Sequence, residues 1–152
     1  MIGVSKIGNK MIPSIKIENV DLQIKEFNLP IDMDLVSDFT KDEDYEILNV
    51  DIDIEILENL EDNDIKKINF LFEWGLVNNL EDALERYDEI YMYENQTMRE
   101  VAYNYIQECY GSSINNLHSL IANNINYEGI AHDLEQEGYY FRVGSDIFEY
   151  HY

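Results

Sequence analysis

The chain of 152 residues has one cysteine, two prolines, ten basic residues and no long apolar run. Because a disulfide needs two thiols, Cys109 can form none within the chain, and one cysteine cannot build a cysteine-based zinc site. No stretch of about 18 apolar residues could cross a membrane, and residues 1–8 lack the apolar centre of a signal peptide. We therefore expect a cytoplasmic protein without a membrane partner.

Basic residues are scarce beside 32 acidic residues, and the formal net charge is −22. Affinity for phosphates depends on lysine and arginine, which displace the counterions of a nucleic acid or an anionic lipid. Such a strongly acidic chain is not expected to bind nucleic acid or anionic lipid unaided. An apolar fraction of 45% also makes a wholly disordered acidic tail an unsuitable interpretation.

The acids are concentrated between residues 42 and 64, where eleven occur without a base. Apolar residues, among them Ile47, Val50 and Leu57, alternate with these acids and indicate a folded framework beneath them. A second group lies at residues 81–89. We predict that both groups form one electrostatic surface, which consists of Asp42, Glu43, Asp44, Glu46, Asp51, Asp53, Glu55, Glu58, Glu61, Asp62, Asp64, Glu81, Asp82, Glu85, Asp88 and Glu89.

The first half of the chain shows patterns of both strands and helices. Residues 12–27 alternate as two strands would, with a turn near Asn19, and Asp32 is a suitable cap for a helix to Phe39. Residues 46–55 alternate too, which predicts a half-buried strand with a row of carboxylates on its solvent face. Helices are expected at residues 62–74, ended by Gly75, and at residues 80–87.

The second half begins with a short strand at residues 90–93, followed by a capping box from Thr97 to Glu100 that opens a helix ending at Gly111. Two further helices and a closing hairpin follow, at residues 117–123, 126–136 and 139–152. The whole pattern predicts an α+β, elongated chain of three small modules. These are an N-terminal module with a small sheet and a short helix (1–57), a short helical middle module (58–88) and a C-terminal α+β module (89–152).

Signs of a catalytic site are sparse. The three histidines, His118, His132 and His151, stand in no recognised catalytic spacing, and no nucleophile elbow, glycine-rich phosphate loop or dinucleotide fingerprint is present. The run from Asp51 to Glu55 has isoleucines and no glycine where a cation-binding loop would need a turn. We therefore predict a protein that is not an enzyme and uses no cofactor and no metal.

Three segments of the C-terminal half carry a family likeness: residues 98–108 (MREVAYNYIQE), residues 125–135 (INYEGIAHDLE) and the aromatic pair of segments at 138–141 (GYYF) and 147–150 (IFEY). In order and spacing they resemble the last domain of the ArdA antirestriction proteins. The resemblance implies a homodimeric DNA mimic, encoded on mobile genetic elements, that occupies the DNA-binding groove of type I restriction-modification enzymes. It also implies a dimer contact in the last domain, at Leu117, Tyr127, Ile130, Ala131 and Leu134.

Other functions remain open on sequence grounds. The same charge would suit a DNA mimic aimed at another nucleic-acid machine, such as a CRISPR effector or a nucleoid protein. A small acidic hydrolase or metal-dependent enzyme, and an acidic adaptor for a basic protein, are alternatives from different classes. Binding of calcium, magnesium or zinc would favour the enzyme.

Overall fold

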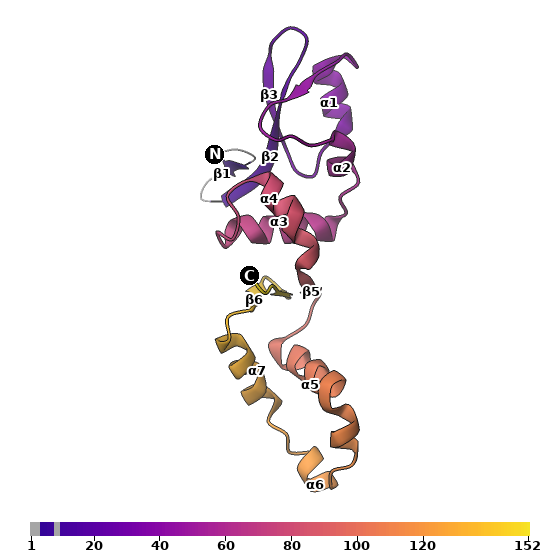
Figure 1. Cartoon of the computed structure of the whole chain (residues 1–152), viewed down its shortest axis with the longest axis vertical. Coiled ribbons are helices and arrows are strands. Elements are labelled where there is room, and N and C mark those ends of the chain that lie inside the picture. The colour runs from indigo at the N-terminus through magenta and orange to yellow at the C-terminus, as the bar shows by residue number, and fades with distance from the viewer. Residues whose placement is uncertain (1–3, 8–9) are drawn as a thin grey trace. The chain divides into compact units, whose positions relative to one another are not determined.

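The computed structural model describes residues 4–7 and 10–152, and it combines helices with two small antiparallel sheets. This confirms the α+β class predicted from the sequence. The chain divides into two compact units, residues 1–88 (unit 1) and residues 89–152 (unit 2). Two of the expected modules, 1–57 and 58–88, lie together in unit 1, and unit 2 has the bounds of the third (Figure 1).

The sheet of unit 1 is built around one long strand, β2. Its first part pairs with β1 and its second part with β3, and its last two residues also pair with β4 on the opposite edge. Ile17 therefore has a neighbouring strand on each side and is fully buried. The strands are β1 (Val4–Ile7), β2 (Lys10–Glu18), β3 (Ile24–Asn28) and β4 (Glu46–Ile47).

Helices complete the core of unit 1, and α3 packs against β2. Asp32 caps the first helix, as predicted. Glu61 is the N-cap of α3, in a capping box with Asp64. Gly75 follows α3 with a φ of +67°, a conformation that glycine adopts without strain. The helices are α1 (Met33–Thr40), α2 (Ile54–Glu58), α3 (Asp62–Glu73), α4 (Leu80–Arg86) and the 3₁₀ turn η1 (Tyr87–Glu89), whose last residue is the first of unit 2.

The predicted strand at residues 46–55 is wrong for most of its length, since only Glu46 and Ile47 form β4 and helix α2 begins at Ile54. The cause is Asn49, whose side chain replaces the backbone ladder: its Oδ1 accepts from Lys16 N at 2.9 Å and its Nδ2 donates to Ser14 O at 3.4 Å. Asp53 then caps α2. The alternation of exposed and covered side chains shifts by one residue within this segment, because Asn49 and Val50 are both covered.

Unit 2 has a three-stranded sheet in the order β5-β7-β6, with α5 packed against α7. The capping box from Thr97 to Glu100 is confirmed, but α5 continues through Gly111 to Asn115, because this glycine keeps a negative φ and nothing interrupts the helix there. The elements are β5 (Tyr91–Tyr93), α5 (Met98–Asn115), α6 (Ser119–Ala122), α7 (Tyr127–Gln136), β6 (Tyr140–Val143) and β7 (Asp146–Glu149).

Of the helices in residues 4–7 and 10–152, none combines the length and the apolar character that crossing a membrane requires.

Candidate acidic interaction surface

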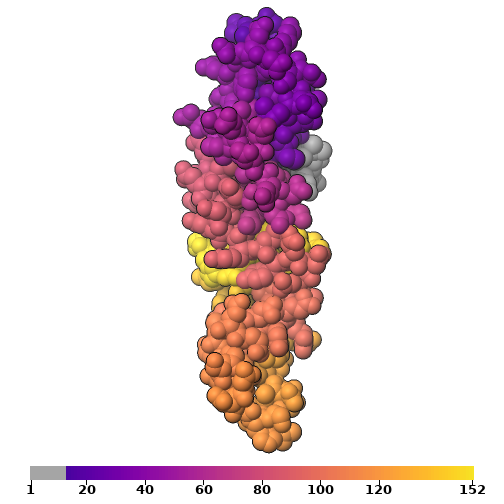
Figure 2. All heavy atoms as spheres, turned by 90° about the vertical axis from the view of Figure 1, so that its right-hand side faces the viewer, coloured from indigo at the N-terminus to yellow at the C-terminus, as the bar shows by residue number. Residues whose placement is uncertain are grey.

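The sixteen acids of the predicted surface belong to the loop between α1 and β4, to β4, α2, α3, α4 and η1, and to the loops that join them. Fifteen of them lie in unit 1, and Glu89 is the first residue of unit 2. Fourteen of the sixteen are exposed, while Asp64 and Asp82 are half-buried. In Figure 2 the atoms of residues 42–64, coloured purple to magenta, lie on the visible face of unit 1. Thirteen exposed acids therefore stand on the outside of unit 1 and are open to solvent.

Buried apolar residues hold this surface in place. Val50, Leu57 and Ile65 lie within or beside the acidic stretch, and each is at most 7% exposed. Because closely packed side chains restrict the backbone that carries them, the neighbouring carboxylates are attached to an ordered framework. This is what separates the arrangement from an acidic tail.

Some of these acids also stabilise the fold. The carboxylate of Asp53 accepts from Glu55 N at 3.4 Å at the start of α2, and Asp64 accepts from Glu61 N at 2.9 Å at the start of α3. Glu81 on α4 accepts from Asp51 N at 3.0 Å and so ties α4 to the irregular segment before α2. Carboxylates at helix N-termini also interact favourably with the helix dipole.

The local excess of negative charge helps to raise the pKa of two tyrosines. Burial raises the pKa of Tyr45 above its ordinary value, and the carboxylates of Asp53 and Glu58 raise it further. Burial likewise raises the pKa of Tyr87, with additional contributions from Asp64 and Asp88. A phenolate at either position would face both partial burial and negative charge, so both side chains stay neutral at physiological pH.

A cavity of about 640 Å³ opens within the acidic surface. It is lined by residues 45–54 together with Glu81, so that Glu46, Asp51 and Asp53 border it along with apolar side chains. Among the residues that the structure describes, no cluster of three or more histidine, cysteine, aspartate or glutamate side chains has the arrangement of a metal site.

The expected dimer contact needs a correction at two of its five residues. Ala131 and Leu134 are 5% and 8% exposed, and both belong to the core of unit 2 with Met98, Val101 and Ile147. They stabilise the folded protomer, so they are not available to contact a second copy. The apolar stripe of α7 indicated a buried face, and the core of unit 2 already accounts for it.

The other three residues lie closer to the surface. Ile130 packs at the edge of that core, and Tyr127 is half-buried. The ring of Tyr127 lies edge-on to Tyr103, with centroids 5.0 Å apart, and its hydroxyl accepts from Gln107 at 3.3 Å. Leu117 is 42% exposed.

Sequence reasoning missed how little of the long helix is covered. The three buried residues of α5, Met98, Val101 and Ala102, are confined to its first five positions, and none of residues 103–126 is buried. Exposed aromatic and aliphatic side chains occupy this stretch, which forms part of the orange surface of Figure 2: Tyr103, Tyr105, Tyr110, Leu117, Leu120 and Ile121. We call these six residues the α5–α6 apolar surface.

The three histidines have separate places. His118 begins α6, and its Nδ1 accepts from Leu120 N at 3.1 Å. His132 is exposed on α7. His151 lies 2.6 Å from the carboxylate of Glu149 and against the ring of Tyr139.

No protein-family model matches the chain, and no curated protein matches it.

Proposed function

We propose that this protein is an antirestriction protein that mimics DNA and occupies the DNA-binding groove of a type I restriction-modification enzyme. The observation that carries the proposal is the exposure of thirteen of the predicted acids on one folded unit, unit 1. The resemblance of the C-terminal segments to ArdA proteins supports the same function.

The amount and the attachment of the charge both suit mimicry. Duplex DNA carries one charge per about 1.7 Å of its axis, so a net charge of −22 corresponds to about 37 Å of duplex. Solubility alone needs a net charge of only about 2–8 units in a small domain. Because the carboxylates stand on an ordered framework, part of the entropy cost of presenting them is met when the chain folds.

In this proposal the protein acts by binding, without catalysis, a cofactor or contact with nucleic acid. Its place of action is the cytoplasm of a bacterial cell, where restriction enzymes meet incoming DNA. Affinity is distributed over many carboxylates, since an exposed ion pair contributes only about 0–1 kcal/mol.

We further propose that the protein acts as a homodimer and that the α5–α6 apolar surface forms the contact between copies. A run of 24 residues without a buried side chain leaves Leu120 and Ile121 71% and 58% exposed. Concentrations of apolar side chains of this kind mark interaction sites. A second copy satisfies them with the same residues across a two-fold axis.

The proposal is tested by binding the chain to purified type I methyltransferase at increasing salt and with competing duplex DNA. Mimicry predicts that duplex DNA and the protein compete for the same groove, so that duplex displaces the protein. It also predicts that the affinity of the protein for the methyltransferase falls steeply with salt. Binding that duplex cannot displace would contradict mimicry of DNA.

The same experiment with a CRISPR effector and with a nucleoid protein identifies the target class. Displacement by duplex from one of those proteins, without binding to the methyltransferase, would assign the mimic to that other machine. If the protein itself turned over DNA or another substrate in these reactions, it would be assigned to the enzymes and the proposal of a DNA mimic would be wrong.

A further inference from the structure

The loop between β2 and β3 exposes three aliphatic side chains within five residues. Val20, Leu22 and Ile24 are 50%, 75% and 57% exposed. The loop stands at the end of unit 1 away from α3 and α4 (Figure 1). Isolated exposed leucines are ordinary on protein surfaces, but three aliphatic side chains at one projecting tip form a concentrated apolar point.

The backbone beneath the central leucine is strained. Leu22 has a φ of +60°, in the left-handed region where glycine, asparagine and aspartate are the usual residues. A leucine there makes the turn less stable than asparagine would, while its own side chain points into solvent. Strain of this kind at an exposed position is typical of a residue whose side chain serves an interaction.

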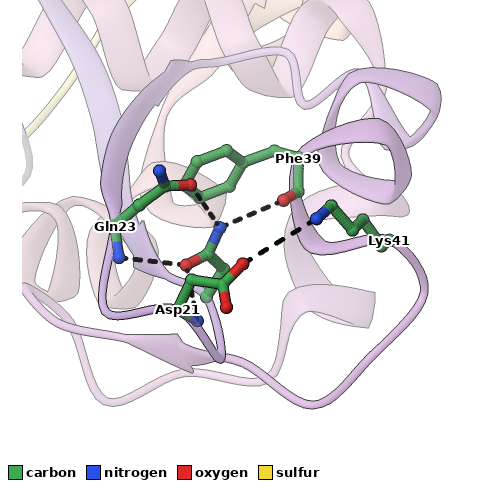
Figure 3. Close-up of polar contacts among 5 residues, drawn as sticks. Asp21, Gln23, Phe39 and Lys41 are labelled. Carbon is green, nitrogen blue, oxygen red and sulfur yellow. Dashed lines mark hydrogen bonds and ion pairs between the residues drawn. The ribbon is translucent and has the colours of Figure 1, made fainter.

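A buried asparagine fixes the shape of this loop. Asn19 is 6% exposed, and its Oδ1 accepts from Asp21 N at 3.1 Å and from Gln23 N at 3.0 Å. Its Nδ2 donates to Gln23 Oε1 at 3.2 Å and to Phe39 O at 3.3 Å, which joins the loop to the end of α1 (Figure 3). An ion pair of 3.8 Å between Lys41 and Asp21 adds a second link on the same side. The exposed side chains are therefore presented in one conformation.

Acidic residues border the tip. Glu18 lies opposite both Ile24 and Glu46 in the sheet, and Asp21 is part of the loop itself. Asp42 follows directly after Lys41, the residue that pairs with Asp21, and Lys25 follows Ile24. The border therefore holds four acids and two bases, and its net charge is negative. An apolar point with a negative border is complementary to an apolar recess with a positive border.

We propose that residues 19–24 form an apolar anchor, which inserts Leu22, flanked by Val20 and Ile24, into an apolar recess bordered by lysine and arginine side chains on the enzyme that the protein inhibits. This inference rests on the proposed function and deepens it. DNA presents phosphates to the groove of the enzyme, as the protein presents carboxylates, but DNA has no aliphatic side chains held in a fixed position. The anchor adds affinity that salt does not screen, and it lets the inhibitor compete with DNA of equal charge.

The test replaces Leu22 with asparagine, which removes the apolar side chain and suits a positive φ. Leu22→Asn is expected to keep or raise the urea midpoint of unit 1, because the turn loses its strain. Its Kd for purified type I methyltransferase should rise at least about tenfold at every salt concentration. This is the effect of losing the burial of one leucine side chain in the complex. The slope of log Kd against log salt should stay that of the wild type, because no charge has changed.

A matched control, Leu35→Asn, removes a 49% exposed leucine from α1 and should leave Kd unchanged. If Leu22→Asn binds like the wild type, the anchor is overturned while mimicry stands. A wild-type protein that fails to bind the methyltransferase overturns the proposed function and the anchor with it. A change of oligomeric state in Leu22→Asn, measured by sedimentation, would assign the tip to a contact between copies and also overturn the anchor.

Discussion

Replacement of Asn19 with alanine should destabilise unit 1 more than its small volume suggests. The side chain is almost fully buried and makes four hydrogen bonds, two to backbone N–H groups of the loop and one to the carbonyl of Phe39 among them. The fourth partner is the exposed Gln23 side chain, which can return to water when the bond is lost. Three bonds therefore enter the magnitude.

Each such bond contributes a net of about 0.5–1.5 kcal/mol to stability. We expect Asn19→Ala to lower the free energy of unfolding of unit 1 by about 2–3 kcal/mol, which moves its urea midpoint by roughly 1–2 M. Asn19→Asp keeps the two acceptor bonds but buries a carboxylate against the carbonyl of Phe39, so its loss at neutral pH should be at least as large as that of the alanine variant.

Trp74 makes the measurement specific to unit 1. It is the only tryptophan of the chain, it caps the C-terminus of α3, and its ring lies 6.4 Å from the buried ring of Phe70. Its fluorescence therefore follows the packing of α3. As a control, Asn59→Ala removes an exposed asparagine from the end of α2 and should change stability by less than about 0.5 kcal/mol.

A loss below about 0.5 kcal/mol in Asn19→Ala would refute the reasoning, because the three bonds counted would then contribute no more than a surface substitution changes. A clearly smaller loss in Asn19→Asp than in Asn19→Ala at neutral pH would refute its second part. It would mean that the two acceptor bonds outweigh the burial of a carboxylate against the carbonyl of Phe39.

Three further predictions concern the charge, the dimer and the closing sheet. Reversal to lysine of six exposed acids that cap no helix (Asp42, Glu43, Asp44, Glu46, Glu55 and Glu58) moves the net charge from −22 to −10 and should abolish inhibition of type I restriction, whereas each single reversal changes inhibition less than about fivefold; a full loss from one of them would contradict a distributed surface. Leu120→Glu with Ile121→Glu should turn a dimer into a monomer in sedimentation equilibrium without loss of helical circular dichroism, since neither side chain is buried; a dimer that persists places the contact elsewhere. Tyr93→Phe removes a 2.7 Å hydrogen bond to Glu149 and should cost about 1–2 kcal/mol at neutral pH. Burial, reinforced by Glu149, raises the pKa of Tyr93, so its stabilisation is complete below about pH 10 and is lost as pH rises from there towards the raised value. Urea unfolding between about pH 7 and 12 should therefore fall less steeply with pH in Tyr93→Phe, and equal slopes would show that this tyrosine does not control the alkaline loss.

Local signals in the sequence were sufficient for most elements of this fold. Asp32 and the Thr97–Glu100 box mark helix starts that the structure reproduces, because a cap acts on residues two or three positions away. The alternation of residues 12–27 likewise predicted the hairpin of β2 and β3 and its turn near Asn19. Each of these features depends on hydrogen bonds between residues close in the chain, so the residue types at those positions are enough to predict it.

Failures occurred where a distant residue decides the local structure. Residues 46–55 have the alternation of a strand, yet Asn49 bonds to the backbone of β2 some 33 to 35 residues away and ends the ladder. Gly111 looks like a helix stop, but nothing after it draws the backbone out of α5. The helical spacing of Leu134 indicates a buried position, which the core of unit 2 confirms, and the error came from the dimer contact that the family likeness implies.

The division of work among the acids bears on how the surface could evolve and how it can be tested. Asp53, Asp64 and Glu81 hold backbone N–H groups, so changing them alters helix starts or the link between α4 and the segment before α2. The exposed acids of residues 42–46 cap no helix, and they are attached to a framework held by apolar residues such as Val50 and Leu57. Removal of charge from these positions should lower the repulsion within the folded unit and therefore keep or raise its stability. A variant that is folded and more stable but no longer inhibits would show that these acids lower stability and are needed for inhibition. If the acids had a purely structural role, their removal would lower stability instead.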